Sequence, residues 1–289
     1  MTSITRRDTL ALTAAAAAAG IVIPGLALAQ APAAAPAGPA QAPGFYRMRL
    51  GDLVVTAIND GAAPRPNVEG LVRNVPVAEV EATLRAQFQP TAPFLNHFTT
   101  LVVESGNRLV LLDTGLGEFG APGTGHWMRN FRAAGYDPAR VTHIAISHFH
   151  GDHISGIRNR AGELVFPNAE ISVPAPEWDF WMSDERMNGM PENQRGGFQN
   201  ARRVFAPIAA NVRRYAPGAE IVTGVTSVAA HGHSPGHCAF AVASGNGRLL
   251  FLGDAITTPA LYARNPDWSP FFDMNEEMGR ATRRRLLDM

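Results

Sequence analysis

The sequence contains no lysine, so all 25 of its basic residues are arginine. Without lysine the chain cannot form a Schiff base with a carbonyl substrate, and it cannot contain the phosphate-binding loop whose motif ends in lysine. Its one cysteine, Cys238, excludes an intrachain disulfide and any zinc site built from several thiolates. Pyridoxal enzymes, phosphate-loop nucleotidases and disulfide-stapled folds are therefore excluded.

Charge of either sign is also scarce. Charged residues make up 17% of the chain, and 25 acidic residues balance the arginines. Proteins that bind nucleic acid need a basic surface to neutralise the phosphates. We therefore expect no nucleic-acid partner.

The amino-terminal segment has few charged residues and accounts for much of this shortage. Arg6-Arg7 precede an apolar run over residues 10–28, which closes with the small-x-small pattern Ala27-Leu28-Ala29. This order is typical of a secretory signal peptide, and the paired arginines resemble the twin-arginine type. A transmembrane anchor is the alternative interpretation, but Pro24 would break such a helix.

We predict that residues 1–29 are an export signal and that residues 30–44, rich in Ala and Pro, are an extended linker. Cleavage of the signal leaves no stable membrane anchor. The mature protein is therefore expected in the periplasm or outside the cell. Residues 45–289 are expected to form one domain.

The hydrophobic pattern of residues 45–289 indicates an α/β fold. Apolar runs on either side of Gly51-Asp52 and of Ser105-Gly106-Asn107 indicate two hairpins. Later strands alternate with stretches of helical spacing, so helices are expected on the outer faces of the sheet. The expected strands lie at 45–50, 53–59, 98–103, 109–112, 141–147, 170–173, 227–232, 238–243 and 248–252. The expected helices lie at 77–88, 176–187 and 197–215. Another helix is expected to end at about 134, and two more are expected to begin at about 152 and at 275.

The segment Ser147-His-Phe-His-Gly-Asp-His153 carries the chemistry. Residues two apart at the end of a strand point to the same side, so His148 and His150 can bind one ion together. Asp152 and His153 begin the next turn and project differently. Four ligand-type side chains in six residues suit two adjacent cations better than a single tetrahedral ion.

Two further segments offer ligands for such a pair of ions. His237 lies on a tight turn that enters a strand, and Asp254 ends the next apolar strand. With the motifs SHFHGDHISG, HSPGH and FLGDA, the sequence resembles the metallo-β-lactamase superfamily of metal-dependent hydrolases. Its leader and spacing look most like the methyl parathion hydrolase and lactonase branch.

This resemblance implies an αββα sandwich with two divalent metal ions, expected to be zinc, at one edge. It implies that His148, His150 and His237 hold the first ion, that Asp152 and His153 hold the second, and that Asp254 bridges them. The family supplies one more histidine beyond Asp254, yet His237 is the last in this chain. We therefore expect the second site to lack a ligand and the domain to be truncated at its C-terminal end. The alternative is replacement of that ligand by water, Asp273 or a partner group.

Other residues receive supporting roles. Asp113, at a strand end in LLDTG, is expected to support the metal ligands from beneath, and Asp152 is expected to move a proton. Phe119, Trp178 and Phe198 are expected to line an apolar pocket for a small neutral substrate. His231 and His233 could serve as spare ligands, but they are expected to support the ligands or to be structural. The remaining histidines and Cys238 are expected to be structural.

These features predict an exported hydrolase that uses a metal-activated water on a lactone, ester or organophosphate. A thioester hydrolase or a mononuclear-iron sulfur dioxygenase uses much the same histidine motif, so both stay open. A metal-binding fragment impaired by its missing ligand is the alternative outside catalysis. The oligomeric state is also left open, a homodimer included.

Overall fold

The computed structural model describes residues 43–289, which form one compact unit. The expected export signal at 1–29 and nearly all of the linker at 30–44 lie outside the described residues. None of the described helices has the length and the hydropathy needed to cross a bilayer.

Residues 45–215 build a seven-stranded mixed sheet in which the strands follow chain order. The first hairpin turns at Gly51, whose φ of 59° is a conformation that favours glycine. Strands β1 to β4 pair antiparallel, and β4 to β7 pair parallel. The strands are β1 (Phe45–Leu50), β2 (Leu53–Arg65), β3 (Phe94–Ser105), β4 (Arg108–Leu112), β5 (His143–Ala145), β6 (Glu170–Pro174) and β7 (Val212–Tyr215).

A second, antiparallel sheet of four strands follows in the order β11-β10-β9-β8. Its strands are β8 (Glu220–Val222), β9 (Val225–Ala229), β10 (Cys238–Ser244) and β11 (Gly247–Phe251). The two sheets enclose one apolar core, in which Val103 and Leu112 of the first sheet share a cluster with Phe240 and Val242 of the second. Burial of these apolar side chains contributes about 25 cal/mol per Å² removed from water.

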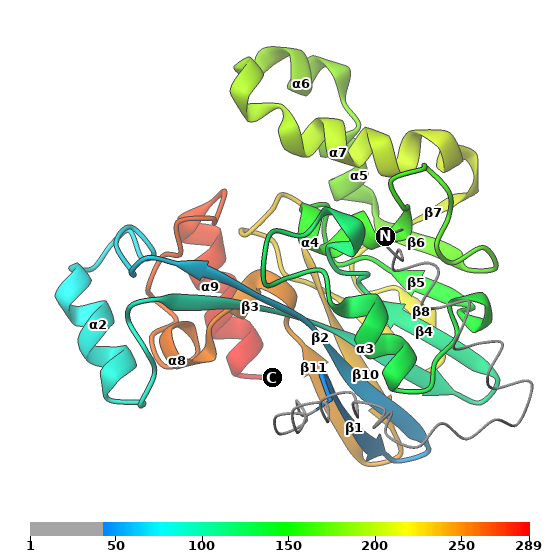
Figure 1. The fold of residues 1–289 in the computed structure, drawn as a ribbon, viewed down its shortest axis with the longest axis horizontal. Coiled ribbons are helices and arrows are strands. Elements are labelled where there is room, and N and C mark those ends of the chain that lie inside the picture. The colour runs from blue at the N-terminus through cyan, green and yellow to red at the C-terminus, as the bar shows by residue number, and fades with distance from the viewer. Residues whose placement is uncertain (1–42) are drawn as a thin grey trace, which may run out of the picture. The chain divides into compact units, whose positions relative to one another are not determined.

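Helices cover the outer face of each sheet (Figure 1). On the first sheet, Phe131 of α3 and Phe198 of α7 share a second core cluster with Ile144 of β5. On the second sheet, Leu286 of α9 packs with Ala239 of β10. These layers confirm the predicted αββα sandwich. The helices are α2 (Val77–Arg85), α3 (Trp127–Ala133), α4 (Gly151–Ile154), α5 (Ala175–Trp181), α6 (Asp184–Gly189), α7 (Gly196–Phe205), α8 (Pro259–Tyr262) and α9 (Glu276–Leu287).

One predicted helix was wrong in its last part, and two strands, β7 and β8, were missed. The helix expected over 197–215 ends at Phe205, and its last four residues are the strand β7, paired with β6. Pro207 stops the helix because it lacks an amide hydrogen and blocks the preceding turn. Strand β8 has only three residues, too few for an alternating pattern to stand out.

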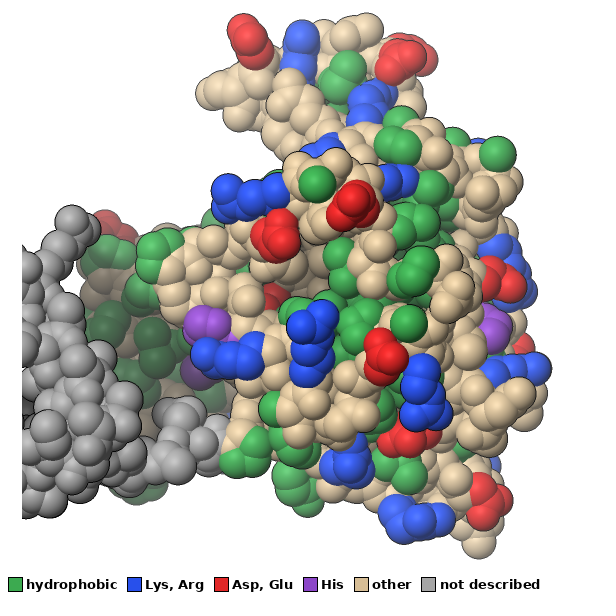
Figure 2. Space-filling model, turned by 45° about the vertical axis from the view of Figure 1, so that its right-hand side comes forward, with side chains coloured by type: hydrophobic (Ala, Val, Ile, Leu, Met, Phe, Trp, Pro, Cys, Tyr) green, Lys and Arg blue, Asp and Glu red, His purple; other side chains and the backbone are tan. Residues whose placement is uncertain are grey.

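On the face shown in Figure 2, acidic and basic side chains are interspersed, with hydrophobic side chains grouped between them. No large area of this face carries charge of one sign.

Candidate metal centre

Loops that follow several strands bring the candidate residues together at one edge of the sandwich. Asp113 follows β4, and the segment from His148 to His153 follows the parallel strand β5. His233 follows β9, and Asp254 follows β11. Strands β9 and β11 both pair antiparallel with β10 and so run the same way. Residues far apart in the sequence therefore meet here.

Three imidazoles and one carboxylate form the first ligand group: His148, His150, His233 and Asp254. The Nδ1 atom of His150 lies 3.0 Å from Nε2 of His148 and 2.8 Å from Nε2 of His233. The third pair, Nε2 of His148 and Nε2 of His233, is 3.1 Å apart. Three ring nitrogens thus point at one another.

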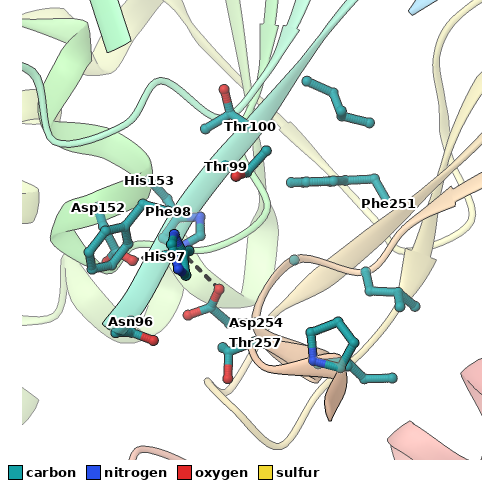
Figure 3. Close-up of a pocket in the computed structure, with 15 residues that line it drawn as sticks. Asn96, His97, Phe98, Thr99, Thr100, Asp152, His153, Phe251, Asp254 and Thr257 are labelled. Carbon is teal, nitrogen blue, oxygen red and sulfur yellow. Dashed lines mark ion pairs between the residues drawn. The ribbon is translucent and has the colours of Figure 1, made fainter. Parts of the chain in front are cut away.

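Asp152, His153 and Asp254 form the second ligand group. Nε2 of His153 lies 3.1 Å from Oδ2 of Asp152 and 3.4 Å from Oδ1 of Asp254, as Figure 3 shows for the second pair. The other oxygen of Asp254, Oδ2, lies 3.4 Å from Nε2 of His233. Asp254 therefore presents one carboxylate oxygen to each group.

Three residues of the first group, His148, His150 and Asp254, have pKa values that favour the protonation states metal ligands need. Burial, together with the neighbouring imidazoles, lowers the pKa of His148 well below its ordinary value. Burial and the nearby His233 lower the pKa of His150 to about 3. Burial alone would raise the pKa of Asp254, but His153 and His233 hold it below its usual range. Neutral imidazoles and an ionised carboxylate are the forms that bind a cation.

The second group concentrates negative charge around one imidazole. Burial would lower the pKa of His153, but Asp152, Asp254 and Asp113 together raise it well above its ordinary value. Burial likewise would raise the pKa of Asp152, whereas His153 lowers it overall. Asp152 and Asp254 present their carboxylate oxygens to Nε2 of His153, and such oxygens are donors suited to a divalent cation.

His237 was expected in the first group, and the structure places His233 there instead. Nδ1 of His237 donates to the carbonyl of Ala230 at 3.1 Å, and Nε2 accepts from the amide of Asp254 at 3.0 Å. Both ring nitrogens are therefore used by the backbone. A Cβ at Gly253 would come within 2.7 Å of Nε2 of His237, so glycine is needed at that position.

The loop with three histidines explains why the wrong one was chosen. His237 directly precedes β10, and its carbonyl accepts from the amide of Ala230 at 2.9 Å, which fixes it in the start of the ladder. His233 lies away from the strand ends, after Gly232 with a φ of 126°. The sequence signal that could have distinguished the two histidines is the distance of each from the next strand. The histidine farther from the strand is less constrained by strand pairing and can turn its ring outward.

Asp113 lies under the second group. Its fully buried carboxylate accepts from the Ser147 amide at 2.7 Å and pairs with Nδ1 of His153 at 2.8 Å. Its φ of 67° is unusual for a residue other than glycine. Such strain is often found where a side chain must be aimed at a functional site.

The three aromatic residues expected around a substrate pocket lie elsewhere. Trp178 and Phe198 are buried with the helices on the first sheet, where Trp178 packs against Phe205 with ring centroids 5.9 Å apart. The guanidinium of Arg203 lies over Phe119, with its Cζ atom 4.0 Å from the centroid of the phenyl ring. Helix packing therefore accounts for Trp178 and Phe198, Phe119 is exposed, and none of the three lines the cavity beside the second group. Asp273, considered as a substitute ligand, faces His233 and is not in the second group.

A cavity of about 370 Å³ opens beside the second group (Figure 3). One wall is formed by residues 96–101 of β3, and the other by residues 251–254 with Ile256, Thr257 and Pro259. Outside the ligand group the lining contains no arginine, aspartate or glutamate. The cavity therefore lies next to the candidate centre, and its walls outside the ligand group carry no acidic or arginine side chain.

The donor sets fit two divalent cations of different coordination. The first group offers three imidazole nitrogens and one carboxylate oxygen, which is a complete tetrahedral set. The second offers three side chains, so a fourth position is open to other donors. Nε2 of His153 is buried and makes no hydrogen bond, although carboxylate oxygens lie nearby. A cation bound at this nitrogen would displace the proton that the raised pKa of His153 keeps on the ring.

Solved structures with this fold include two hydrolases. The chain superposes on AidC, a dizinc quorum-quenching lactonase in complex with a product, with a TM-score of 0.79 and 27% identity, covering 85% of this chain and 86% of AidC. It superposes on AbOPH, a hydrolase in the beta lactamase superfamily, with a TM-score of 0.79 and 25% identity, covering 86% of each chain.

Among curated proteins, the chain is similar to "Probable metallo-hydrolase Rv2300c" of Mycobacterium tuberculosis and to "Probable metallo-hydrolase Mb2322c" of Mycobacterium bovis. Each is 30% identical over 177 residues, 54% of this chain and 55% of the relative. The chain spans about half the length of the curated relatives it matches. The family model of the metallo-beta-lactamase superfamily matches residues 92–287, which contain both ligand groups. Since that match covers more than half of the sequence, the chain belongs to the metallo-β-lactamase superfamily.

Proposed function

We propose that this chain is a metal-dependent hydrolase of a small neutral lactone, ester or organophosphate. The observation that carries the proposal is the position of Asp254, which turns one carboxylate oxygen to each of two ligand groups. The two groups would hold two adjacent cations, which would make a water molecule nucleophilic near neutral pH and polarise the oxygen under attack. The nitrogen and oxygen donors favour zinc.

The chain's own residues supply the remaining parts of such a reaction. Asp152 borders the cavity. His153 lowers the pKa of Asp152 below its ordinary value, so the Asp152 carboxylate is ionised and able to accept a proton. Asp113 fixes the His153 ring by pairing with its Nδ1 atom at 2.8 Å. His237 holds the backbone amide of Asp254 and so the direction of that carboxylate.

The cavity supports a neutral substrate. Phe98, Phe251 and Ile256 give it apolar area, while Thr99 and Thr257 add hydroxyl groups. An anionic substrate would find no arginine among the residues that line it. The likeness to AidC, a lactonase, supports a lactone as the first substrate to test.

The test is hydrolysis of a lactone, an aryl ester and a phosphotriester by the zinc-loaded chain. We expect turnover of at least one substrate, loss of that turnover on chelation and its return when zinc is restored. Full metal loading with no hydrolysis of any of the three would contradict the proposal. Asp152→Asn should lower kcat by about 100-fold or more, because it removes a proton acceptor and a charged ligand.

A further inference from the structure

Glu177, in the first turn of α5, is a fully buried carboxylate outside both ligand groups. It accepts four hydrogen bonds. Oε1 accepts from the hydroxyl of Ser234 and the amide of Gly236, both at 2.6 Å. Oε2 accepts from the amide of Phe149 at 2.9 Å and from the indole nitrogen of Trp181 at 2.8 Å.

Three of these donors belong to the two loops that carry the histidines of the first ligand group. Phe149 stands between His148 and His150, while Ser234 directly follows His233. Glu177 is thus the point where the loop after β5 and the loop after β9 are joined through one side chain. The join is tight, because a Cβ at Gly236 would lie 2.5 Å from the amide nitrogen of Glu177.

The fourth donor extends the connection to a ligand ring. The indole of Trp181 lies edge-on to the imidazole of His150, with ring centroids 5.7 Å apart. The hydrogen bond from this indole to Glu177 fixes its position. His150 is therefore supported on its backbone side by Phe149 and on its ring by Trp181.

No arginine in residues 43–289 forms an ion pair with Glu177. A buried carboxylate without a countercharge is costly unless its oxygens are fully hydrogen-bonded, and here each oxygen has two donors. We propose that Glu177 is a positioning residue for the first ligand group, setting the separation between His150 and His233. This inference rests on the metal centre under the proposed function.

Glu177→Gln tests the proposal with little change in shape. An amide presents one oxygen, so its nitrogen would face two of the four donors and both of those bonds would be lost. We expect zinc affinity at the first group to fall by about 10- to 100-fold, the usual effect of removing a group that orients metal ligands.

The affinity of each group is measured in a chain that keeps only that group. Asp152→Ala leaves the first group intact, and His233→Ala disrupts it while leaving the second. Zinc affinity is determined by competition with a chromophoric chelator, with and without Glu177→Gln in each background. We expect the loss in the Asp152→Ala background and a change of less than about threefold in the His233→Ala background.

Glu104→Gln is the matched control. Glu104 also accepts a hydrogen bond, from the hydroxyl of Tyr136 at 2.7 Å, but it belongs to neither ligand group. This variant should bind zinc as the parent does. An unchanged affinity of the first group in Glu177→Gln, or equal losses in both groups, would overturn the proposal.

Ser234→Ala keeps the test decisive if Glu177→Gln does not fold. It removes one donor to Oε1 and leaves the carboxylate in place. We expect about a tenfold loss of zinc affinity at the first group, because a hydrogen bond to a charged group is lost. No loss in this variant would contradict the positioning role. Since zinc binding is measured without substrate, a failure of the hydrolase proposal would show separately, as bound metal without turnover.

Discussion

His231 and His233 lie two residues apart on one loop and face different surroundings. Nε2 of His233 points at the other imidazoles of the first group, whereas Nδ1 of His231 has no hydrogen-bond partner and its ring is outside the group. We expect His233→Ala to lose one bound zinc ion per chain and His231→Ala to keep the parent content. Metal analysis after dialysis measures this. Equal content in the two variants would show that the ligand assignment is wrong.

Local motifs made part of this site predictable from the sequence. His148, His150, Asp152 and His153 lie within six residues, so their proximity follows from the chain itself. The choice between His233 and His237 depended on the hydrogen bonds of the His237 ring with the backbone of Ala230 and Asp254. Nothing local marks Glu177, because its donors come from three separate segments.

Cys238 provides a pH-dependent prediction. Burial raises the pKa of its thiol from 9.0 to about 12. As pH rises past 9, the unfolded chain releases this proton first, so the native state loses stability between about pH 9 and 12, by about 1.4 kcal/mol per pH unit for one group. Urea unfolding of the parent and Cys238→Ala at pH 8 and 10 measures the difference. The decrease should be smaller in the variant, and equal decreases would refute the effect.

At the scale of elements, α9 is tied to the metal centre by a buried ion pair. Nη1 of Arg283 lies 2.8 Å from Oδ2 of Asp273, and both side chains are fully buried. The other oxygen of Asp273 lies 3.6 Å from Nδ1 of His233. Arg283 also donates to the carbonyls of Pro266 and Trp268. The helix therefore supports the loop that carries His233.

Arg283→Met should destabilise the fold strongly, because it leaves the Asp273 carboxylate buried without its partner. We expect the free energy of unfolding to fall by about 3–5 kcal/mol. Arg284→Met is the matched control, since Arg284 pairs with Asp267 at the surface and should contribute less than about 1 kcal/mol. Urea denaturation of both variants compares them, and similar losses would count against a structural role for the buried pair.

Elements with long, regular patterns were predicted correctly from the sequence. The hairpin around Gly51 has the expected strands, with β2 extended to Arg65, and α2 begins at Val77 as expected. Strands β7 and β8 were not predicted from the sequence, because segments of three or four residues show too little periodicity. Their identity is set by pairing with neighbouring strands, which is tertiary information.

At the scale of the whole molecule, the sandwich brings four loops to one edge and leaves a cavity beside them. The layered architecture followed from the order of strands and helices, and the comparisons confirm the superfamily. The walls of the cavity did not follow from the sequence, because Trp178 and Phe198 pack under helices, Phe119 is exposed, and none of the three lines the cavity. Export through residues 1–29 stays a prediction.

The central claim is that two ions bind on either side of Asp254. Anomalous X-ray scattering at the zinc edge, from crystals of the zinc-loaded chain, tests it directly. We predict two peaks, one among His148, His150 and His233 and one beside Asp152 and His153, with an Asp254 oxygen next to each. A peak bound by His237, or no peak on one side of Asp254, would contradict the claim.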